Sequence, residues 1–294
     1  MNESLREKIE KIRYILFDLD GTLFGANHCL DAEAAEMLRE LMARGYYVGA
    51  ATGRSLISLF PYFDTHGFCF NAPSVGSAGA EAGVPKLCDA ERVYCRPFPN
   101  ETLRQMLRDF TAQGYTFCTD GMKQIFISER AGESYVQYER EEAKKMGYSY
   151  PEIVQVPDDG TDCVCNGSVF KLMVFYETEQ QKQFIFQYLA SREDAHGFQP
   201  GDFHMVEMLP TGCDKAVGVQ KAAESLGLTL ENCCVFGDSG NDVAMLKAAG
   251  LSVAMCNASD DAKQAADLIT ELPNSQQGAV RMALKLFPPL QQAK

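Results

Sequence analysis

Short apolar runs alternate with helical segments at both ends of this chain, and this alternation limits the possible folds more than any other feature. Tyr14 to Phe17 and Tyr46 to Ala51 are apolar runs, and between them Asp31 can cap a helix that Gly45 would end. The pattern returns later, in the runs Cys233 to Phe236, Leu251 to Met255 and Leu268 to Ile269. Strands that alternate with helices are typical of a parallel sheet. We therefore expect both ends of the chain to form one α/β domain.

The middle of the chain has a different pattern. Gly83-Val84-Pro85 interrupts the alternation, and helices are expected after Asn100 and around Phe184. Other segments alternate polar and apolar residues, as antiparallel strands do. They are Tyr115 to Cys118, Gln124 to Ser128 and Ser168 to Tyr176. We therefore predict an α+β domain inserted into the α/β domain.

This insertion divides the chain into three segments. Residues 1–84 and 206–294 are predicted to form the α/β domain, and residues 85–205 the inserted domain, with the strand Phe203 to Met208 carrying the chain back. Two domains agree with the length of 294 residues, because a single core stops growing at roughly 250 to 300 residues.

Charge and composition limit the partners. The formal net charge is −13, from 27 basic and 40 acidic residues, and without a stripe of Lys and Arg we expect no nucleic-acid partner. No apolar run approaches the roughly 18 residues of a membrane span, and residues 1–11 are polar rather than signal-like. We therefore expect a cytoplasmic protein without a membrane partner, whose 11 cysteines stay reduced.

Two carboxylates follow the first apolar run directly, in Asp18-Leu19-Asp20-Gly21-Thr22. In open α/β sheets, ligands bind beyond the carboxyl ends of the strands. Two neighbouring acids repel each other there, and a hard divalent cation such as Mg²⁺ would relieve the repulsion. Because Asp and Gly also suit turns, this segment alone is equally consistent with an acidic turn.

A second acidic segment, Gly237-Asp238-Ser239-Gly240-Asn241-Asp242, follows the apolar run that ends at Phe236. Asp, Ser and Asn are common helix caps, so Asp242 alone is no evidence for a site. Capping does not explain acids at two strand ends of one sheet. A shared cation would explain why Asp18, Asp20, Asp238 and Asp242 gather at one edge.

Thr52, Gly53 and Lys215 are candidates for binding phosphate at that edge. Thr52 offers a hydroxyl at a strand end, and Gly53 offers an accessible backbone N–H. Lys215 opens a predicted helix, where its charge opposes the helix dipole, as expected of a residue that serves a site. A polar strand end, and a solvated lysine paired with Asp214, are the alternatives.

Other catalytic motifs are missing. The sequence has no Gly-x-x-x-x-Gly-Lys-Ser/Thr loop, no Gly-x-Gly-x-x-Gly turn and no Gly-x-Ser-x-Gly elbow. ATP is therefore not the expected substrate, and an aspartate is the best candidate nucleophile.

Together the motifs resemble those of the haloacid dehalogenase (HAD) superfamily of phosphohydrolases, in particular its Cof-like branch. The four motifs correspond to Asp18 to Leu23, Thr52-Gly53-Arg54, Lys215 and Gly237 to Asp242, and the resemblance continues in Val253 to Ala258 and Ala266 to Thr270. One difference is Ala78, where such proteins often have Asn. The resemblance implies a Rossmann-like parallel-sheet core with an inserted α+β cap domain.

The resemblance also implies a mechanism. Asp18 would attack phosphorus to form an aspartyl-phosphate, and Asp20 would protonate the leaving alcohol and later deprotonate the attacking water. Mg²⁺ would be held by Asp18, the main-chain carbonyl of Asp20, Asp238 and, directly or through water, Asp242. The phosphate would be bound by Thr52, Gly53, Lys215 and Asn241.

The expected activity is therefore that of a Mg²⁺-dependent phosphatase acting on a small phosphorylated metabolite, such as a sugar phosphate. A phosphomutase, which returns the phosphoryl group to its substrate, is an alternative. A signalling module that stores phosphate on an aspartate is another, although the inserted domain and the acid two residues after Asp18 favour turnover.

Overall fold

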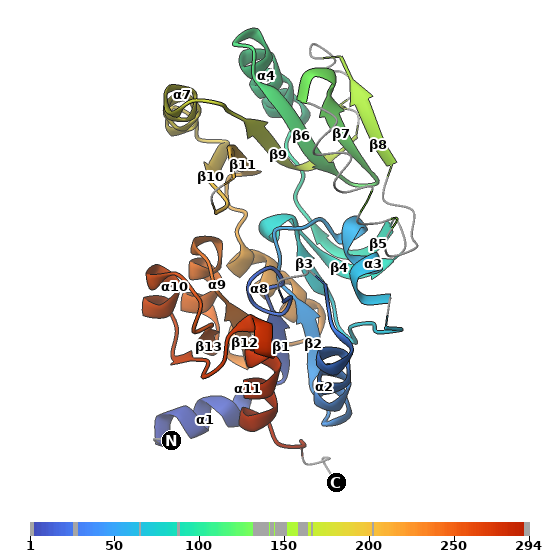
Figure 1. Cartoon of the computed structure of the whole chain (residues 1–294), viewed down its shortest axis with the longest axis vertical. Helices are drawn as coiled ribbons and strands as arrows, with labels where there is room; N and C mark the ends of the chain where they lie inside the picture. The colour runs from blue at the N-terminus through green and yellow to red at the C-terminus, as the bar shows by residue number, and fades with distance from the viewer. Residues whose placement is uncertain are drawn as a thin grey trace.

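The computed structural model describes residues 3–25, 29–64, 66–86, 89–131, 141, 144, 152–157, 164–165, 167–201 and 203–290. Within this part, the chain forms two lobes, each built around its own sheet (Figure 1). The lower lobe in Figure 1 contains both ends of the described chain, and the upper lobe is formed by its middle.

A five-stranded parallel sheet forms the centre of the lower lobe, in the order β14-β13-β12-β1-β2. The strands are β1 (Tyr14–Phe17), β2 (Tyr47–Ala50), β12 (Cys233–Gly237), β13 (Leu251–Ala254) and β14 (Leu268–Ile269). All four residues of β1 are buried, as expected for a parallel strand covered on both faces. Because β1 pairs with β2 on one side and β12 on the other, its carboxyl end lies where a ligand is expected in such a sheet.

Helices surround this sheet. They are α1 (Glu3–Lys11), α2 (Ala32–Ala43), α3 (Leu56–Asp64), α8 (Lys215–Ser225), α9 (Val243–Ala248), α10 (Asp260–Ala265) and α11 (Gly278–Leu286), with short 3-10 helices η1 (Ser77–Gly79), η3 (Leu230–Asn232), η4 (Gly240–Asp242) and η5 (Asn274–Gln276). Helix α2 begins and ends as predicted. At its start, the Asp31 side chain accepts a hydrogen bond from the Ala34 N–H at 2.7 Å. After its end, Gly45 has a left-handed φ of 97°.

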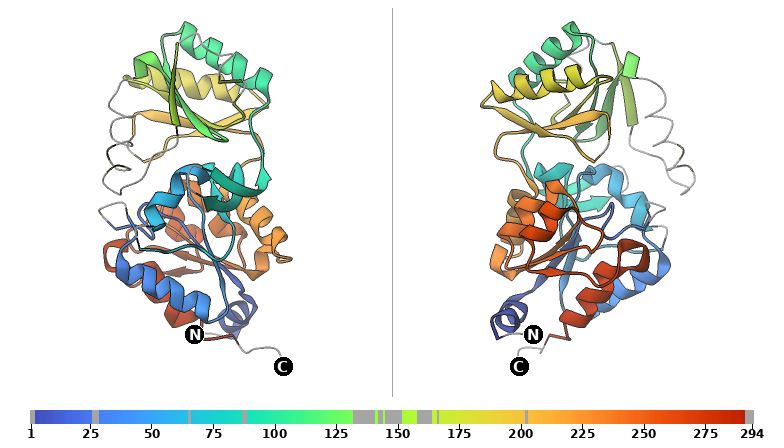
Figure 2. Two further views of the ribbon diagram at one scale, coloured as in Figure 1. Left: turned by 90° about the vertical axis from the view of Figure 1, so that its right-hand side faces the viewer. Right: turned by 60° about the vertical axis from the view of Figure 1, so that its left-hand side comes forward.

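A six-stranded sheet forms the upper lobe, in the order β10-β11-β9-β6-β7-β8. Its strands are β6 (Thr116–Gly121), β7 (Gln124–Ser128), β8 (Glu152–Val156), β9 (Val169–Phe175), β10 (Ala195–Phe198) and β11 (Met205–Pro210), and η2 (Glu129–Ala131) follows β7. The pairs are antiparallel except β7–β8. Helices α4 (Asn100–Ala112) and α7 (Glu179–Ala190) cover the face of this sheet that points away from the lower lobe (Figure 2).

Side chains alternate between the two faces of the upper sheet. Leu172 and Val174 of β9 share a hydrophobic cluster with Phe110 of α4 and Ile185 of α7. Lys171, which precedes Leu172 in β9, therefore points to the opposite face, toward the lower lobe.

A third sheet contains the segment that we expected to break the pattern. The strands β3 (Ser74–Gly76), β4 (Glu81–Lys86) and β5 (Asp89–Cys95) pair in antiparallel order. Gly83-Val84-Pro85 lies within β4, which belongs to this antiparallel sheet and not to the parallel one. The register shifts between Ala82 and Gly83, and a Cβ on Gly83 would lie 2.3 Å from the Glu91 carbonyl oxygen. Glycine here permits a bulge with close strand approach rather than a loop.

The predicted domain boundaries, between residues 84 and 85 and between residues 205 and 206, remain predictions. Strand β5 pairs with β4, and β11 pairs with β9 and β10. From this pairing, we propose that the chain crosses between the lobes at residues 96–99 and 211–214.

Two predictions from composition concern membranes and thiols. No helix in the described ranges is long and apolar enough to cross a membrane. The described cysteines are all free, and Cys118, Cys165, Cys213, Cys233 and Cys234 among them are buried, as small hydrophobic side chains would be.

Gly79 and Gly227 allow a matched test of the packing beside α8. Both have a left-handed φ, of 101° and 71°. A Cβ added to Gly79 would lie 1.9 Å from the Asp214 carbonyl oxygen, whereas a Cβ added to Gly227 would have open space around it, with no heavy atom of the described chain beyond the adjacent residues within 4 Å. We expect Gly227→Ala to lower the free energy of unfolding by about 1 to 2 kcal/mol. Gly79→Ala adds overpacking, which costs about 1 to 3 kcal/mol more. Urea denaturation measures both, and equal losses would contradict this packing.

Candidate active site

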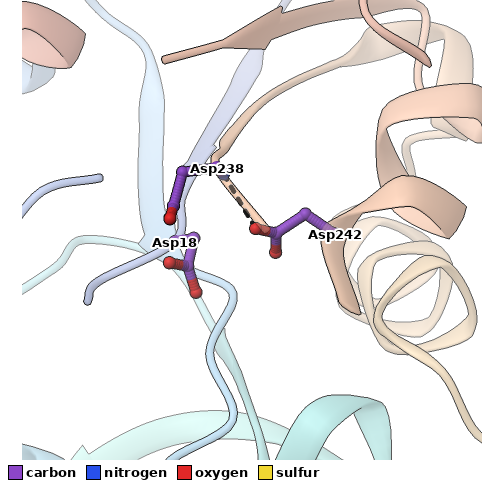
Figure 3. Close-up of side chains that lie close together, drawn as sticks. All are labelled: Asp18, Asp238 and Asp242. Carbon is purple, nitrogen blue, oxygen red and sulfur yellow. Dashed lines mark hydrogen bonds between the residues drawn. The ribbon is translucent and has the colours of Figure 1, made fainter. Parts of the chain in front are cut away.

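Three carboxylates meet at the carboxyl end of the parallel sheet. Asp18 follows β1, Asp238 follows β12, and Asp242 ends η4. Each offers an oxygen within 4.8 Å of the others, and Figure 3 shows the three side chains turned toward a common region. The fourth predicted acid, Asp20, is not part of this group.

This group of acids is short of positive charge. Burial raises the pKa of Asp18 well above its ordinary value, and the charges of Asp242 and Asp238 raise it further, although Lys215 opposes them. Burial, followed by the charge of Asp242, raises the pKa of Asp238 to about 6. Three carboxylates and one ammonium leave a formal charge of −2 when all are ionised, which a divalent cation would balance.

Lys215 is the ammonium between these acids. It is the first residue of α8, whose N-cap Asp214 accepts a hydrogen bond from the Val217 N–H. Its Nζ donates to Asp18 Oδ1 and to Asp242 Oδ1, at 2.6 Å each, and its side chain is only 1% exposed. Although burial disfavours the charge, the two carboxylates raise the pKa of Lys215. These contacts account for a lysine at a helix start.

Asp242 also shapes the loop that carries Asp238. Its Oδ2 accepts hydrogen bonds from the backbone N–H groups of Asp238 at 2.9 Å and Ser239 at 3.0 Å, the first of which is drawn in Figure 3. Since Oδ1 accepts from Lys215, both oxygens of Asp242 are engaged. The described hydrogen bonds of Asp18 and Asp238 use one carboxylate oxygen each.

Gly21 allows the first acidic loop to lie against the second. Its φ is 87°, and a Cβ there would lie 2.5 Å from Asp238 Oδ2. Thr22, the next residue, donates from Oγ1 to Asp238 Oδ1 at 2.8 Å. Glycine and a hydroxyl residue at these two positions therefore join the two loops.

Asp20 faces a different partner. Arg54 donates from Nε to Asp20 Oδ2 at 2.7 Å and from Nη2 to Oδ1 at 2.8 Å, a bidentate pair. The guanidinium also lies over the Tyr62 ring, 4.5 Å from its centroid. The sequence places Arg54 in the second motif but does not by itself indicate a role for it. Its position directly after Thr52-Gly53 was the available signal.

The predicted phosphate-binding groups lie along the same edge. Thr52 is buried, and its Oγ1 accepts a hydrogen bond from the Arg54 N–H at 3.2 Å. A Cβ on Gly53 would lie 4.0 Å from Asn241 Nδ2, so these two residues face each other. Asn241 also accepts a hydrogen bond from Ser239 Oγ at 2.7 Å.

A cleft of about 1500 Å³ lies between the lobes, lined by most of these groups but not by Asp242. From the lower lobe, its walls include Asp18, Asp20, Thr52, Gly53, Arg54, Lys215, Asp238 and Asn241. From the upper lobe, they include Asp120, Lys171 and Glu207, which we did not identify from the sequence. A charged residue inside the apolar strand β9 was the signal for Lys171.

Ala78 also lines this cleft, in η1. Its φ of 52° and ψ of 33° are left-handed, which costs roughly 1 to 2 kcal/mol for a residue with a Cβ. Asn tolerates this conformation better than Ala. The departure noted in the sequence therefore places a methyl group, instead of an amide, at a strained position in the cleft wall.

Known proteins resemble this chain over most of its length. The model of the haloacid dehalogenase-like hydrolase family matches residues 15–284. The HMP-PP phosphatase of Yersinia pseudotuberculosis is 28% identical, over 90% of this chain and 89% of that protein. The 5-amino-6-(5-phospho-D-ribitylamino)uracil phosphatase YitU of Bacillus subtilis is 25% identical, over 93% and 97%. A solved haloacid dehalogenase-like hydrolase from B. subtilis has a TM-score of 0.79 at 22% identity, covering 92% of this chain and 98% of that one.

Replacing Lys215 by Met tests how the acids are held. We expect Lys215→Met to lower the free energy of unfolding by about 3 to 5 kcal/mol, because Asp18 and Asp242 lose their shared buried cation. Lys221→Met is the control on the same helix, since Lys221 forms an exposed pair with Glu224, and should cost less than about 1 kcal/mol. Urea denaturation in the presence of a chelator gives both values. Similar losses for the two variants would show that Lys215 does not hold the acids together.

Proposed function

Since the chain belongs to the family of haloacid dehalogenase-like hydrolases, we propose that it is a Mg²⁺-dependent phosphatase that hydrolyses a small phosphomonoester through an aspartyl-phosphate. The observation that carries this proposal is Lys215 bridging Asp18 and Asp242 beside Asp238, at the carboxyl ends of β1 and β12. A buried carboxylate with an adjacent ammonium is a suitable nucleophile for a phosphate anion.

Family membership confirms the resemblance that we drew from the four motifs. The predicted fold class, a parallel-sheet core with an additional α+β domain, is also confirmed. So is the enzyme class, a hydrolase that acts on phosphate esters. The names of the two relatives support a small phosphorylated molecule as the substrate.

The acidic group fits Mg²⁺. It provides carboxylate oxygens, which this ion prefers, and it lacks positive charge. Asp18 and Asp238 would hold the ion, together with the main-chain carbonyl of Asp20. Asp242, whose oxygens are engaged, would act through Lys215 or through a water molecule. When bound, the ion would supply the charge that lets a phosphate approach these acids.

Asp18 is proposed to form a bond to phosphorus while the bond from phosphorus to the ester oxygen breaks. Asp20 gives its proton to the departing oxygen, and then takes a proton from the water that releases phosphate from Asp18. In the structure Arg54 binds Asp20 as a carboxylate through two hydrogen bonds, so Asp20 would have to leave this pair and take up a proton from water before it protonates the departing oxygen. Thr52, the Gly53 N–H, Lys215 and Asn241 would bind the phosphate oxygens.

Phosphate release from a panel of sugar phosphates and aryl phosphates tests this function. We expect Mg²⁺-dependent release that disappears in chelator and falls more than a thousandfold in Asp18→Asn, which lacks the nucleophile. Asp261→Asn, an exposed aspartate in α10, should behave as the wild type. Activity that persists undiminished in chelator would contradict the proposal. Movement of phosphate to another position of the substrate, without release, would indicate a mutase.

Replacing Asp20 by Asn separates the two chemical steps. Nitrophenol leaves without protonation, so Asp20→Asn should still form the aspartyl-phosphate from nitrophenyl phosphate but hydrolyse it slowly. We expect a burst of nitrophenol close to one equivalent of enzyme, followed by turnover roughly a hundredfold slower or more than in the wild type. Rapid-quench kinetics measures the burst. A slow first turnover with no burst would contradict the assigned roles.

A further inference from the structure

A buried charged cluster in the upper lobe has no part in the chemistry above. It consists of Asp120 in β6, Lys171 in β9 and Glu207 in β11, three neighbouring strands. The exposed fractions of these residues are only 6%, 4% and 6%. All three line the cleft that contains Asp18. Removing charges from water is costly, so we expect a buried charged cluster to have a role that offsets this cost.

Lys171 connects this cluster to the lower lobe. Its Nζ donates to Glu207 Oε1 at 3.0 Å and lies 3.2 Å from Asp120 Oδ2. It also donates to the backbone carbonyl oxygen of Gly53 at 2.7 Å. Although burial disfavours the charge, the two acids raise the pKa of Lys171, so they keep the ammonium charged. The ammonium therefore donates two hydrogen bonds, to Glu207 and to Gly53, and forms an ion pair with Asp120, whose Oδ2 accepts no hydrogen bond from the described residues.

The Gly53 carbonyl belongs to the peptide that orients Thr52. The N–H of this peptide is that of Arg54, which donates to Thr52 Oγ1 at 3.2 Å. A hydrogen bond from an ammonium to the carbonyl polarises the peptide and strengthens donation by its N–H. Because Thr52 Oγ1 accepts this bond, its own hydrogen is available to donate elsewhere. The backbone of Thr52 is fixed by Val75 and Ala78.

We propose that Lys171 is a positioning residue that couples the upper lobe to phosphate binding in the lower lobe. Through the Gly53 carbonyl, it holds residues 52–54 so that the Thr52 hydroxyl donates to phosphate. Asp120 and Glu207 keep Lys171 charged and directed at Gly53. The coupling rests on the proposed function, since it requires a phosphate at Asp18.

Inorganic phosphate is the decisive probe, because it has no leaving group for the upper lobe to contact. In the presence of Mg²⁺, we expect Lys171→Met to weaken its binding about tenfold, measured by calorimetry and by competitive inhibition. The variant should lose kcat/KM by a similar factor for glycerol phosphate, phosphoglycerate and nitrophenyl phosphate, whose leaving groups differ in charge and size. Lys171→Arg should recover part of both losses. Glu177→Gln, an exposed acid at the rim of the cleft, is the control.

A neutral variant separates positioning from stability. Asp120→Asn, Lys171→Met and Glu207→Gln combined leave no unpaired buried charge, so the protein should unfold at a higher urea concentration than Lys171→Met alone. Its phosphate affinity should stay as weak as in the single variant. Recovery of phosphate affinity together with stability would overturn the inference.

Other outcomes also decide between the proposals. If Lys171→Met leaves phosphate affinity unchanged, or if its losses depend on the leaving group, Lys171 contacts the leaving group or serves stability only, and the coupling is wrong. If the wild type neither binds phosphate nor hydrolyses any ester, the proposed function fails, and the coupling fails with it.

Discussion

The structure depends on holding three carboxylates at one sheet edge with a single ammonium among them. Asp18, Asp238 and Asp242 lie within reach of one ion, and Lys215 contacts two of them. Like charges in a buried place repel, and the raised pKa values of Asp18 and Asp238 reflect both burial and this repulsion. The surroundings are built to hold the acids there. Backbone N–H groups bind Asp242, and Gly21 leaves room for Asp238.

The insertion of the upper lobe serves this arrangement. In the proposed division, the chain returns to the lower lobe through residues 211–214, and Lys215 follows at once as the first residue of α8. Gly79 contacts the same junction from η1, next to Ala78 in the cleft wall. The lysine that balances the acids is therefore placed by the segment that joins the lobes. A movement of the upper lobe about this junction would act on the site directly.

Local patterns were enough to predict the parallel sheet and its acids, because Asp18 and Asp238 directly follow buried strands whose apolar runs are continuous, and Asp20 and Asp242 lie a few residues further on. The pair Asp20–Arg54 and the contact of Lys171 with Gly53 could not be predicted in this way. They join residues 34 and 118 positions apart, and depend on how loops and lobes pack. The bulge at Gly83 could not be predicted for a related reason, since the closeness of Glu91 decides the role of that glycine.

Among the described residues, each lobe has a lysine buried between two acids, and a comparison of the two lysines indicates what each is suited to do. Lys215 lies between Asp18 and Asp242, and Lys171 between Asp120 and Glu207. Buried ion pairs add little stability compared with well-packed apolar residues, so stability alone does not account for them. The surroundings of the two lysines differ. Lys215 stands beside Asp238, where charge is still lacking, whereas Lys171 donates to the Gly53 carbonyl of the other lobe. The first cluster is therefore suited to binding a ligand, and the second to holding the loop that would receive it.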